Sequence, residues 1–389
     1  MPPGADRDAR ELELRLRLGQ ALLASRGWSA SETGAAYECA FELSRGLGGE
    51  RLLPVMYGLY TFYFVRGEYE RSLGVAEQRL EQARGPSAET IERLGLRWRG
   101  LAQLLQGKLG AARENLSAVV EPVNPEEHAN TVLNYGTNPR SSTQSFLALC
   151  DAVQGYRTRA LERCEQSVAY AEQLGSPFDR CHQFTWSAMV CMALDEQELL
   201  EHYVEKVREV SRQHHFQLWE VASINFGAIA DIVREHRKSV DKFTWSIQVY
   251  RHDIGANHMV VLSQTEFSRR VLGIGQVDRA RQAIEAAKSV LELTGERCYE
   301  PEVFRVDAEV SDAEGGVHMH KRLLEALSSA RQRDAKLWEL KAATSLANWY
   351  QRNDDTAQAR ATLTPVVEAL SSQDELVPLA RARRLLDTL

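Results

Sequence analysis

The sequence predicts an all-α protein, folded as a right-handed α-α superhelix of about nine helix pairs that ends in a C-terminal capping helix. The first observation is the spacing of apolar residues. They recur at i, i+3, i+4 and i+7, as at Leu161, Cys164, Val168 and Ala171, which is the period of a helix and not of a strand. The second observation is a turn signal that returns about every forty residues, which is typical of a helical repeat array.

The repeat is clearest in five turns that share one spacing. Gly or Asp stands in the turn, and Ala or Ser follows five residues later. The five cases are Gly67 with Ser72, Gly107 with Ala112, Gly155 with Ala160, Gly275 with Ala280 and Asp354 with Ala359. Gly and Asp suit a tight turn between antiparallel helices, and a small residue lets the two backbones approach closely. The wider gaps hold weaker copies, near "LDEQELLEHYVEKVREV", "REHRKSVDKFTWSIQVY" and "EGGVHMHKRLLEALSSA".

These signals divide the chain into helix pairs. The predicted pairs are 10–24 with 31–47, 50–66 with 68–84, 88–106 with 108–121, 139–154 with 156–174, 177–194 with 196–213, 216–234 with 237–252, 256–273 with 276–294, 299–313 with 317–333 and 336–351 with 355–371, followed by a lone helix at 374–389. One pair cannot bury its apolar face alone, so we expect a single stacked array over residues 1–389, with an inserted loop at about 121–140.

Composition narrows the classes of function. The chain has 389 residues and a net charge of −7, and it shows no basic footprint of a nucleic-acid binder. It has no stretch of 18 uncharged apolar residues and no apolar signal core near its N-terminus. Its six cysteines are scattered, which favours free thiols in a reducing compartment. We therefore expect a cytoplasmic protein that contacts neither a membrane nor nucleic acid directly.

The spacing of turn and alanine resembles that of tetratricopeptide repeats, although about forty residues exceeds their usual length of 34. The stretches "LLPVMYGLYTFYFVRGEYERSLGVAEQRL", "LNYGTNPRSS", "TGERCYEPEVFRVDAEV" and "LWELKAATSLANWYQRNDDTAQARATL" resemble the C-terminal repeat region of bacterial STAND/AAA ATPase–nucleotide cyclase signalling proteins. The resemblance runs from about Glu11 to Leu389. Two departures are Asn138 and Arg140, where that family usually has Asp and Gly, and the tail "SSQDELVPL" differs as well.

The enzymatic modules of that family are absent from the sequence. It contains no G-x-x-x-x-G-K-[ST] phosphate loop and nothing that resembles the metal-binding carboxylates of a cyclase. The resemblance therefore implies a sensor or scaffold part and not an enzyme. The histidines and cysteines do not change this expectation. His318 and His320, for example, are two residues apart and would point to different sides of a helix, so we expect no metal, cofactor or catalytic residue.

The stretch "LNYGTNPRSS" interrupts the helices. Asn138 is a good helix cap and Pro139 fits a first helical turn. Two interpretations remain open. The stretch is either a structural loop packed on the array, or it brings Tyr135, Asn138 and Arg140 to the concave groove, where they touch a partner.

Polar rows on the first helices of the late pairs are further candidates, because first helices usually line the concave side of such arrays. Two rows have helical spacing, with Arg269 expected between them on a neighbouring repeat. The rows are Glu302, Arg305 and Glu309, and Lys341, Thr344 and Asn348. They form either a solvated face with intrahelical pairs or a groove that receives a peptide or helix.

Aromatic residues crowd one predicted helix, at positions 57, 60, 62, 63 and 64. Helix-to-helix packing on both flanks favours a core role for them, and exposed interface anchors are the alternative. The tryptophans at 98, 186, 219 and 338 are interpreted as packing residues.

We therefore expect a non-enzymatic protein-binding scaffold or sensor subunit of a bacterial regulatory or effector complex, which grips a partner segment in its concave groove. The partner would be another protein, for example an ATPase or effector on a separate chain. Two alternatives remain. One is a small-molecule-sensing repeat domain with the 121–140 insertion as its lid, and the other is a nucleic-acid-associated subunit of a larger complex.

Overall fold

The computed structural model describes residues 4–44, 52–81, 88–120, 138–234, 236–370 and 376–389, and in this part of the chain every regular element is a helix. The helices are α1 (Ala5–Arg26), α2 (Ser31–Ser44), α3 (Leu52–Arg66), α4 (Tyr69–Glu81), α5 (Ala88–Leu105), α6 (Leu109–Ser117), α8 (Pro139–Val153), α9 (Arg157–Leu174), α10 (Pro177–Leu194), α11 (Gln197–Gln213), α12 (Gln217–Asp231), α13 (His236–Gln248), α14 (Val260–Gly273), α15 (Val277–Thr294), α16 (Glu300–Ala313), α17 (Met319–Gln332), α18 (Lys336–Arg352), α19 (Thr356–Leu370) and α20 (Val377–Thr388). A short π-helix, η1 (Val249–Asp253), continues α13.

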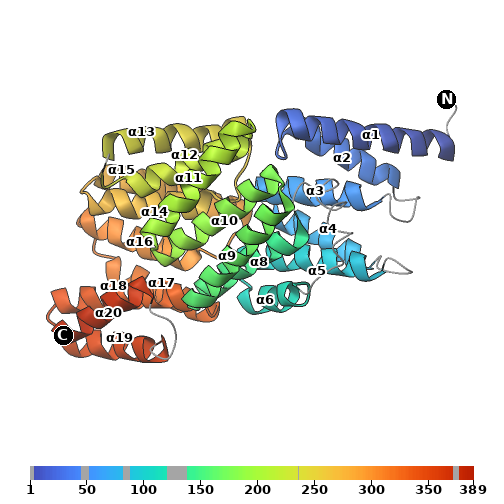
Figure 1. The fold of residues 1–389 in the computed structure, drawn as a ribbon. Coiled ribbons are helices and arrows are strands. Elements are labelled where there is room, and N and C mark those ends of the chain that lie inside the picture. The colour runs from blue at the N-terminus through green and yellow to red at the C-terminus, as the bar shows by residue number, and fades with distance from the viewer. Residues whose placement is uncertain (1–3, 45–51, 82–87, 121–137, 235, 371–375) are drawn as a thin grey trace.

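The predicted helix pairs are confirmed within the described residues. Successive helices pack as nine antiparallel pairs, from α1 with α2 to α18 with α19, and α20 packs on the last pair as a single helix. Most boundaries lie within three residues of the prediction, and α10 matches it fully. The chain coils from α1 to α20 as an all-α superhelix, with its two ends on opposite sides of the molecule (Figure 1).

The turns have the backbone conformation that the sequence predicts. All five turn residues have positive φ, at 79° for Gly67, 73° for Gly107, 88° for Gly155, 77° for Gly275 and 59° for Asp354. The small residues five positions later, Ser72, Ala112, Ala160, Ala280 and Ala359, are completely buried. Two of the weaker copies also have a turn residue with positive φ, Asp195 in one and Gly315 in the other. His215 and Asp334 adopt the same conformation in the turns between successive pairs, α11–α12 and α17–α18.

Successive turns of the superhelix touch each other, which closes the array into a compact coil. The carbonyl oxygen of Val65 accepts hydrogen bonds from the backbone N–H groups of Asn257 and His258, at 2.9 and 3.3 Å. The carbonyl oxygen of Leu105, forty residues later, accepts two from residues 297 and 298, at 2.8 and 3.1 Å. In both cases a turn between paired helices contacts the segment that precedes a helix five pairs further along the chain.

The turn glycines are needed for this contact as well as for the turns. A Cβ atom on Gly67 would lie 2.5 Å from Cγ2 of Thr294, and one on Gly107 would lie 3.1 Å from the backbone of Arg297. The equivalent position at Gly275 faces open space. The contact between superhelical turns therefore depends on the absence of side chains at particular repeats.

The core is continuous along the array. The five aromatic residues of α3 are at most 6% exposed, so their interpretation as core is confirmed. The four tryptophans at 98, 186, 219 and 338 are buried as well. The six cysteines are free thiols, and five of them are buried. None of the described helices combines the length and the apolar character that crossing a membrane requires.

Candidate functional site

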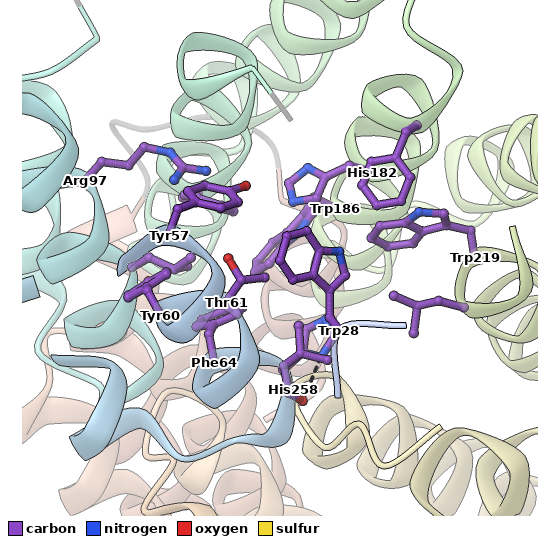
Figure 2. A pocket seen from close by; sticks show the side chains of 15 residues that line it. Trp28, Tyr57, Tyr60, Thr61, Phe64, Arg97, His182, Trp186, Trp219 and His258 are labelled. Carbon is purple, nitrogen blue, oxygen red and sulfur yellow. Dashed lines mark hydrogen bonds between the residues drawn. The ribbon is translucent and has the colours of Figure 1, made fainter. Parts of the chain in front are cut away.

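The first helices of five successive pairs meet around one cavity on the inner side of the coil (Figure 2). Its volume is about 60 Å³, which is room for a few water molecules. Helices α3, α5, α8, α10 and α12 supply most of the wall, and residues from the α1–α2 turn and the segment before α14 complete it. The lining residues are Trp28, Tyr57, Tyr60, Thr61, Phe64, Val65, Arg97, Leu101, Phe146, Phe178, His182, Trp186, Leu218, Trp219 and His258.

Helical spacing explains why the wall is aromatic. On α3 the cavity-lining positions 57, 60, 61 and 64 are one face of the helix, and on α10 positions 178, 182 and 186 form a second stripe. Figure 2 shows the α3 residues on one side of the cavity and those of α10 on the other. Ring contacts hold the wall together, with centroid distances of 5.8 Å between Trp28 and Tyr57 and 4.8 Å between Phe146 and Trp186.

Arg97 on α5 places a positive charge in this aromatic wall. Its side chain is buried, and its Nε and Nη2 atoms donate to the hydroxyl of Ser142 at 3.2 and 2.6 Å. The guanidinium carbon lies 5.2 Å from the ring centre of Phe146. Burial lowers the pKa of Arg97, but a guanidinium stays protonated in proteins. Among the described residues Arg97 makes no direct ion pair, although the charge of the buried Asp179 on α10 acts on it and opposes the lowering of its pKa.

Two polar atoms of the cavity residues lack a hydrogen-bond partner in the described part of the chain, the Nδ1 of His182 and the Nε1 of Trp219. Burial, with a contribution from nearby Arg97, lowers the pKa of His182 to about 3. Burial also lowers the pKa of His258 to about 4. Both imidazoles are therefore neutral at pH 7, and Arg97 is the charged side chain among the lining residues.

The cavity is not sealed from solvent. Most of its wall is buried, but Thr61, Phe178, His182 and Leu218 keep part of their surface accessible. A group that enters would meet aromatic rings on all sides together with one guanidinium. Such a site can bind, but it offers no nucleophile paired with a base. Among the described residues, no group of three His, Cys, Asp or Glu side chains could hold a metal ion.

The predicted loop residues lie elsewhere. Asn138 caps α8 as expected, with its side-chain oxygen accepting from the N–H groups of Arg140 and Ser141 at 2.8 and 3.3 Å. Its own N–H donates to the carboxylate of Asp179 at 3.1 Å, so the cap ties α8 to α10. The guanidinium of Arg140 lies 4.7 Å from the ring centre of Tyr170 on α9, away from the cavity.

Tyr135 lies outside the described residues, as does most of the predicted 121–140 insertion. The interpretation of the stretch as a partner contact is therefore not tested, and it stays a prediction. The helix start at Asn138 and Pro139 is confirmed.

The structure brings five of the predicted polar residues together, as members of a buried polar network. We use this name for Asp195, Glu266, Arg269, Glu302, Arg305, Glu309, Lys341 and Arg381. Glu302 is completely buried, with Arg305 at 2.6 Å, and Arg305 also contacts Glu309 at 2.6 Å. The row is thus no solvated face. Thr344 and the exposed Asn348, the other two residues of the predicted rows, lie outside the network, and whether any of the seven binds a partner stays a prediction.

Asp195 joins this network from a turn, and sequence analysis missed it. The residue follows α10, and its carboxylate lies 2.9 Å from Arg269, 3.6 Å from Lys341 and 3.1 Å from Arg381. Burial alone would raise the pKa of Asp195, but these three cations hold it well below its usual range. Asp195 therefore joins the turn after α10 to α14, α18 and α20, and α16 supplies further ion pairs of the network.

The cavity residues were also missed as a site. Trp186 and Trp219 were interpreted as packing residues, and Arg97 and His182 were not singled out as binding residues. One signal was available, because Phe178, His182 and Trp186 follow each other at intervals of four on one helix. That spacing places the three side chains on one face of the helix, but it does not show which other helices pack against that face.

Comparison with known proteins supports the fold. No family model matches the sequence, and no curated protein sequence matches it significantly. The crystal structure of a Rap protein in complex with Competence and Sporulation Factor superposes with a TM-score of 0.62 at 12% identity, over 94% of this chain and 100% of that one. Yeast Tom70 gives a TM-score of 0.36 at 11% identity, over 98% and 96%. The chain has a tetratricopeptide-like helical repeat fold.

Proposed function

We propose that the chain is a non-enzymatic, protein-binding scaffold whose aromatic cavity anchors one residue of a partner segment. The size of the cavity carries this proposal. Pockets for drug-sized molecules have volumes of roughly 300–1,000 Å³, whereas this cavity measures about 60 Å³. It can take the end of one side chain but not a whole small-molecule effector, which argues against the alternative of a small-molecule sensor.

The composition of the wall supports the same proposal. Interface anchors concentrate in well-packed, desolvated pockets, where tryptophan, tyrosine and arginine contribute most of the binding energy. Trp28, Tyr57, Arg97 and Trp219 supply such a wall here. The polar network offers less to a partner, because its buried charges already contact each other.

The setting of this binding is also part of the proposal. The Rap protein of similar fold was crystallised with Competence and Sporulation Factor, which gives an example of this fold holding a bound factor. The resemblance to bacterial signalling ATPases favours a sensor or scaffold subunit that works with an ATPase or effector on a separate chain. Binding would bias that effector by the difference in affinity between its two states.

A variant in which a larger side chain blocks the cavity tests the proposal. Thr61 lines the cavity and is half-buried, so Thr61→Leu places a larger apolar side chain at its wall. Thr344→Leu is the matched control, because Thr344 is half-buried on another first helix, α18, and does not line the cavity. Peptides would be selected on the purified wild-type chain from a displayed random library, and their dissociation constants measured by fluorescence anisotropy.

We expect Thr61→Leu to weaken the selected peptides at least tenfold and Thr344→Leu to change their affinity less than twofold. Equal affinity for wild type and Thr61→Leu would show that the cavity is not the anchor site. Failure to select any peptide from a diverse library would count against protein binding altogether.

A further inference from the structure

We propose that the anchor residue enters the cavity with a carboxylate and that Arg97 is its counter-ion. This inference rests on the proposed function, since it names the chemistry of the residue that the cavity takes. It is carried by the lack of a direct ion-pair partner for Arg97 among the described residues, by the hydrogen-bonding capacity of the wall and by the volume of the cavity.

The state of Arg97 differs from that of the buried cations in the polar network. Arg269 contacts two carboxylates, and Arg305 contacts two as well. Lys341 lies 3.6 Å from Asp195. Arg97, which is only 5% exposed, has the hydroxyl of Ser142 and the face of Phe146 instead. The nearby carboxylate of Asp179 acts on Arg97 through its charge, but its oxygens accept hydrogen bonds from Asn138, Ser141 and Gln183. A buried charge without a direct ion-pair partner is costly, and a carboxylate from a partner would reduce that cost.

The remaining polar atoms of the wall favour an acceptor. The indole Nε1 of Trp219 can only donate, and it lacks a partner in the described part of the chain. The Nδ1 of His182, which also lacks a hydrogen-bond partner there, donates or accepts according to its tautomer. The guanidinium of Arg97 can donate to both oxygens of a carboxylate, and the indole and the imidazole add hydrogen-bonding atoms elsewhere in the same wall. A lysine or arginine side chain would bring a second cation next to Arg97.

The volume suits the same group. A space of about 60 Å³ accommodates a carboxylate with its adjoining carbon, and the surrounding rings exclude water. In such a low-dielectric setting a charge-assisted hydrogen bond is stronger than at the surface. The carboxylate could belong to an aspartate or glutamate side chain or to the C-terminus of the partner, and the experiment separates these two sources.

The test uses two displayed-peptide libraries on the intact chain, one with free and one with amidated C-termini. Selected peptides are measured against wild type, Arg97→Gln, Arg97→Lys and Thr61→Leu. Each peptide is also measured with its acidic residues changed to Asn or Gln, which probes the charge without altering the protein. Circular dichroism and thermal unfolding confirm that each variant is folded.

We expect the peptides to share one acidic residue, or a free C-terminus, whose neutralisation weakens binding at least tenfold. Arg97→Gln should abolish this preference, and Arg97→Lys should retain part of it. Peptides that are lost with Thr61→Leu but bind equally well without any carboxylate would overturn this inference and leave the proposed function standing. Peptides unaffected by Thr61→Leu would instead overturn the proposed function.

Discussion

Replacing Asp195 by asparagine should destabilise the protein strongly, because it removes the negative charge that joins α10 to α18 and α20. The backbone of Asp195 has a φ of 64°, and asparagine adopts this left-handed conformation as well as aspartate does. The substitution therefore changes charge and little else. Its carboxylate contacts Arg269, Lys341 and Arg381 in the folded protein.

The three contacts contribute unequally. The side chain of Arg381 is 53% exposed, so its ion pair is worth at most about 1 kcal/mol. Arg269 keeps Glu266 at 2.6 Å after the change. Lys341 is 7% exposed, and within the described residues it keeps direct contacts to the carbonyl oxygen of Ala193 and the ring of Trp338 but no ion pair. Leaving a buried charge without its partner costs about 3–5 kcal/mol, which is the loss we expect.

Urea unfolding followed by circular dichroism measures this loss by linear extrapolation. Asp354→Asn is the matched control, because Asp354 has a φ of 59° but is exposed, and it should change the free energy of unfolding by less than about 0.5 kcal/mol. The double variant Asp195→Asn/Lys341→Met should recover most of the loss, since no unpaired ammonium remains. A loss below about 1 kcal/mol for Asp195→Asn, or no recovery in the double variant, would refute the reasoning.

Three further predictions concern pH and packing. Burial raises the pKa of Glu296 from 4.5 to about 8, so the folded state favours its protonated form and the free energy of unfolding should fall as pH rises from 4.5 to about 8. Glu296→Gln should remove that fall in urea titrations between pH 5 and 9, and an unchanged pH slope would contradict it. The pH dependence of stability that His258 contributes has the opposite sign, because the pKa of His258 is lowered from 6.5 to about 4. Stability should be lost as pH falls from 6.5 through 4, and His258→Gln should flatten the acid limb of thermal unfolding measured at each pH. Gly67→Ala and Gly275→Ala impose the same left-handed strain of about 1 kcal/mol. Only the new methyl group of Gly67→Ala also clashes with Thr294, so Gly67→Ala should melt at a lower temperature than Gly275→Ala. Equal melting temperatures for the two variants would contradict the close contact between Gly67 and Thr294.

Local features of the fold could be predicted from the sequence because they depend on near neighbours. A turn glycine and a small residue five positions later set the geometry of one helix pair, and this pattern repeats from Gly67 to Asp354. Asn138 and Pro139 likewise define the start of α8 through their own backbone preferences. Such signals require only a few consecutive residues, so helix boundaries were predicted within a few positions.

The closure of the coil could not be predicted in this way. Val65 meets Asn257 because small rotations between pairs add up until the start of the seventh pair lies over the second. The sequence of one helix pair does not determine this accumulated rotation. The same long-range contact buries Glu296, and burial raises its pKa although the hydrogen bond from Tyr69 lowers it. The neighbouring sequence gives no sign of this burial.

The aromatic cavity was not predicted from the sequence, for a related physical reason. Periodicity showed that Glu302, Arg305 and Glu309 share a helix face, and polarity suggested that a partner meets that face. What determines availability is whether a charge already has a counter-ion, and for Arg305 and Lys341 the chain supplies one. Arg97 belongs to no row of polar residues with helical spacing that the sequence analysis singled out, so by sequence it was less prominent than the polar rows. The fold makes it the more available cation, because the chain provides the other buried cations named here with carboxylates and gives Arg97 a hydroxyl and an aromatic ring.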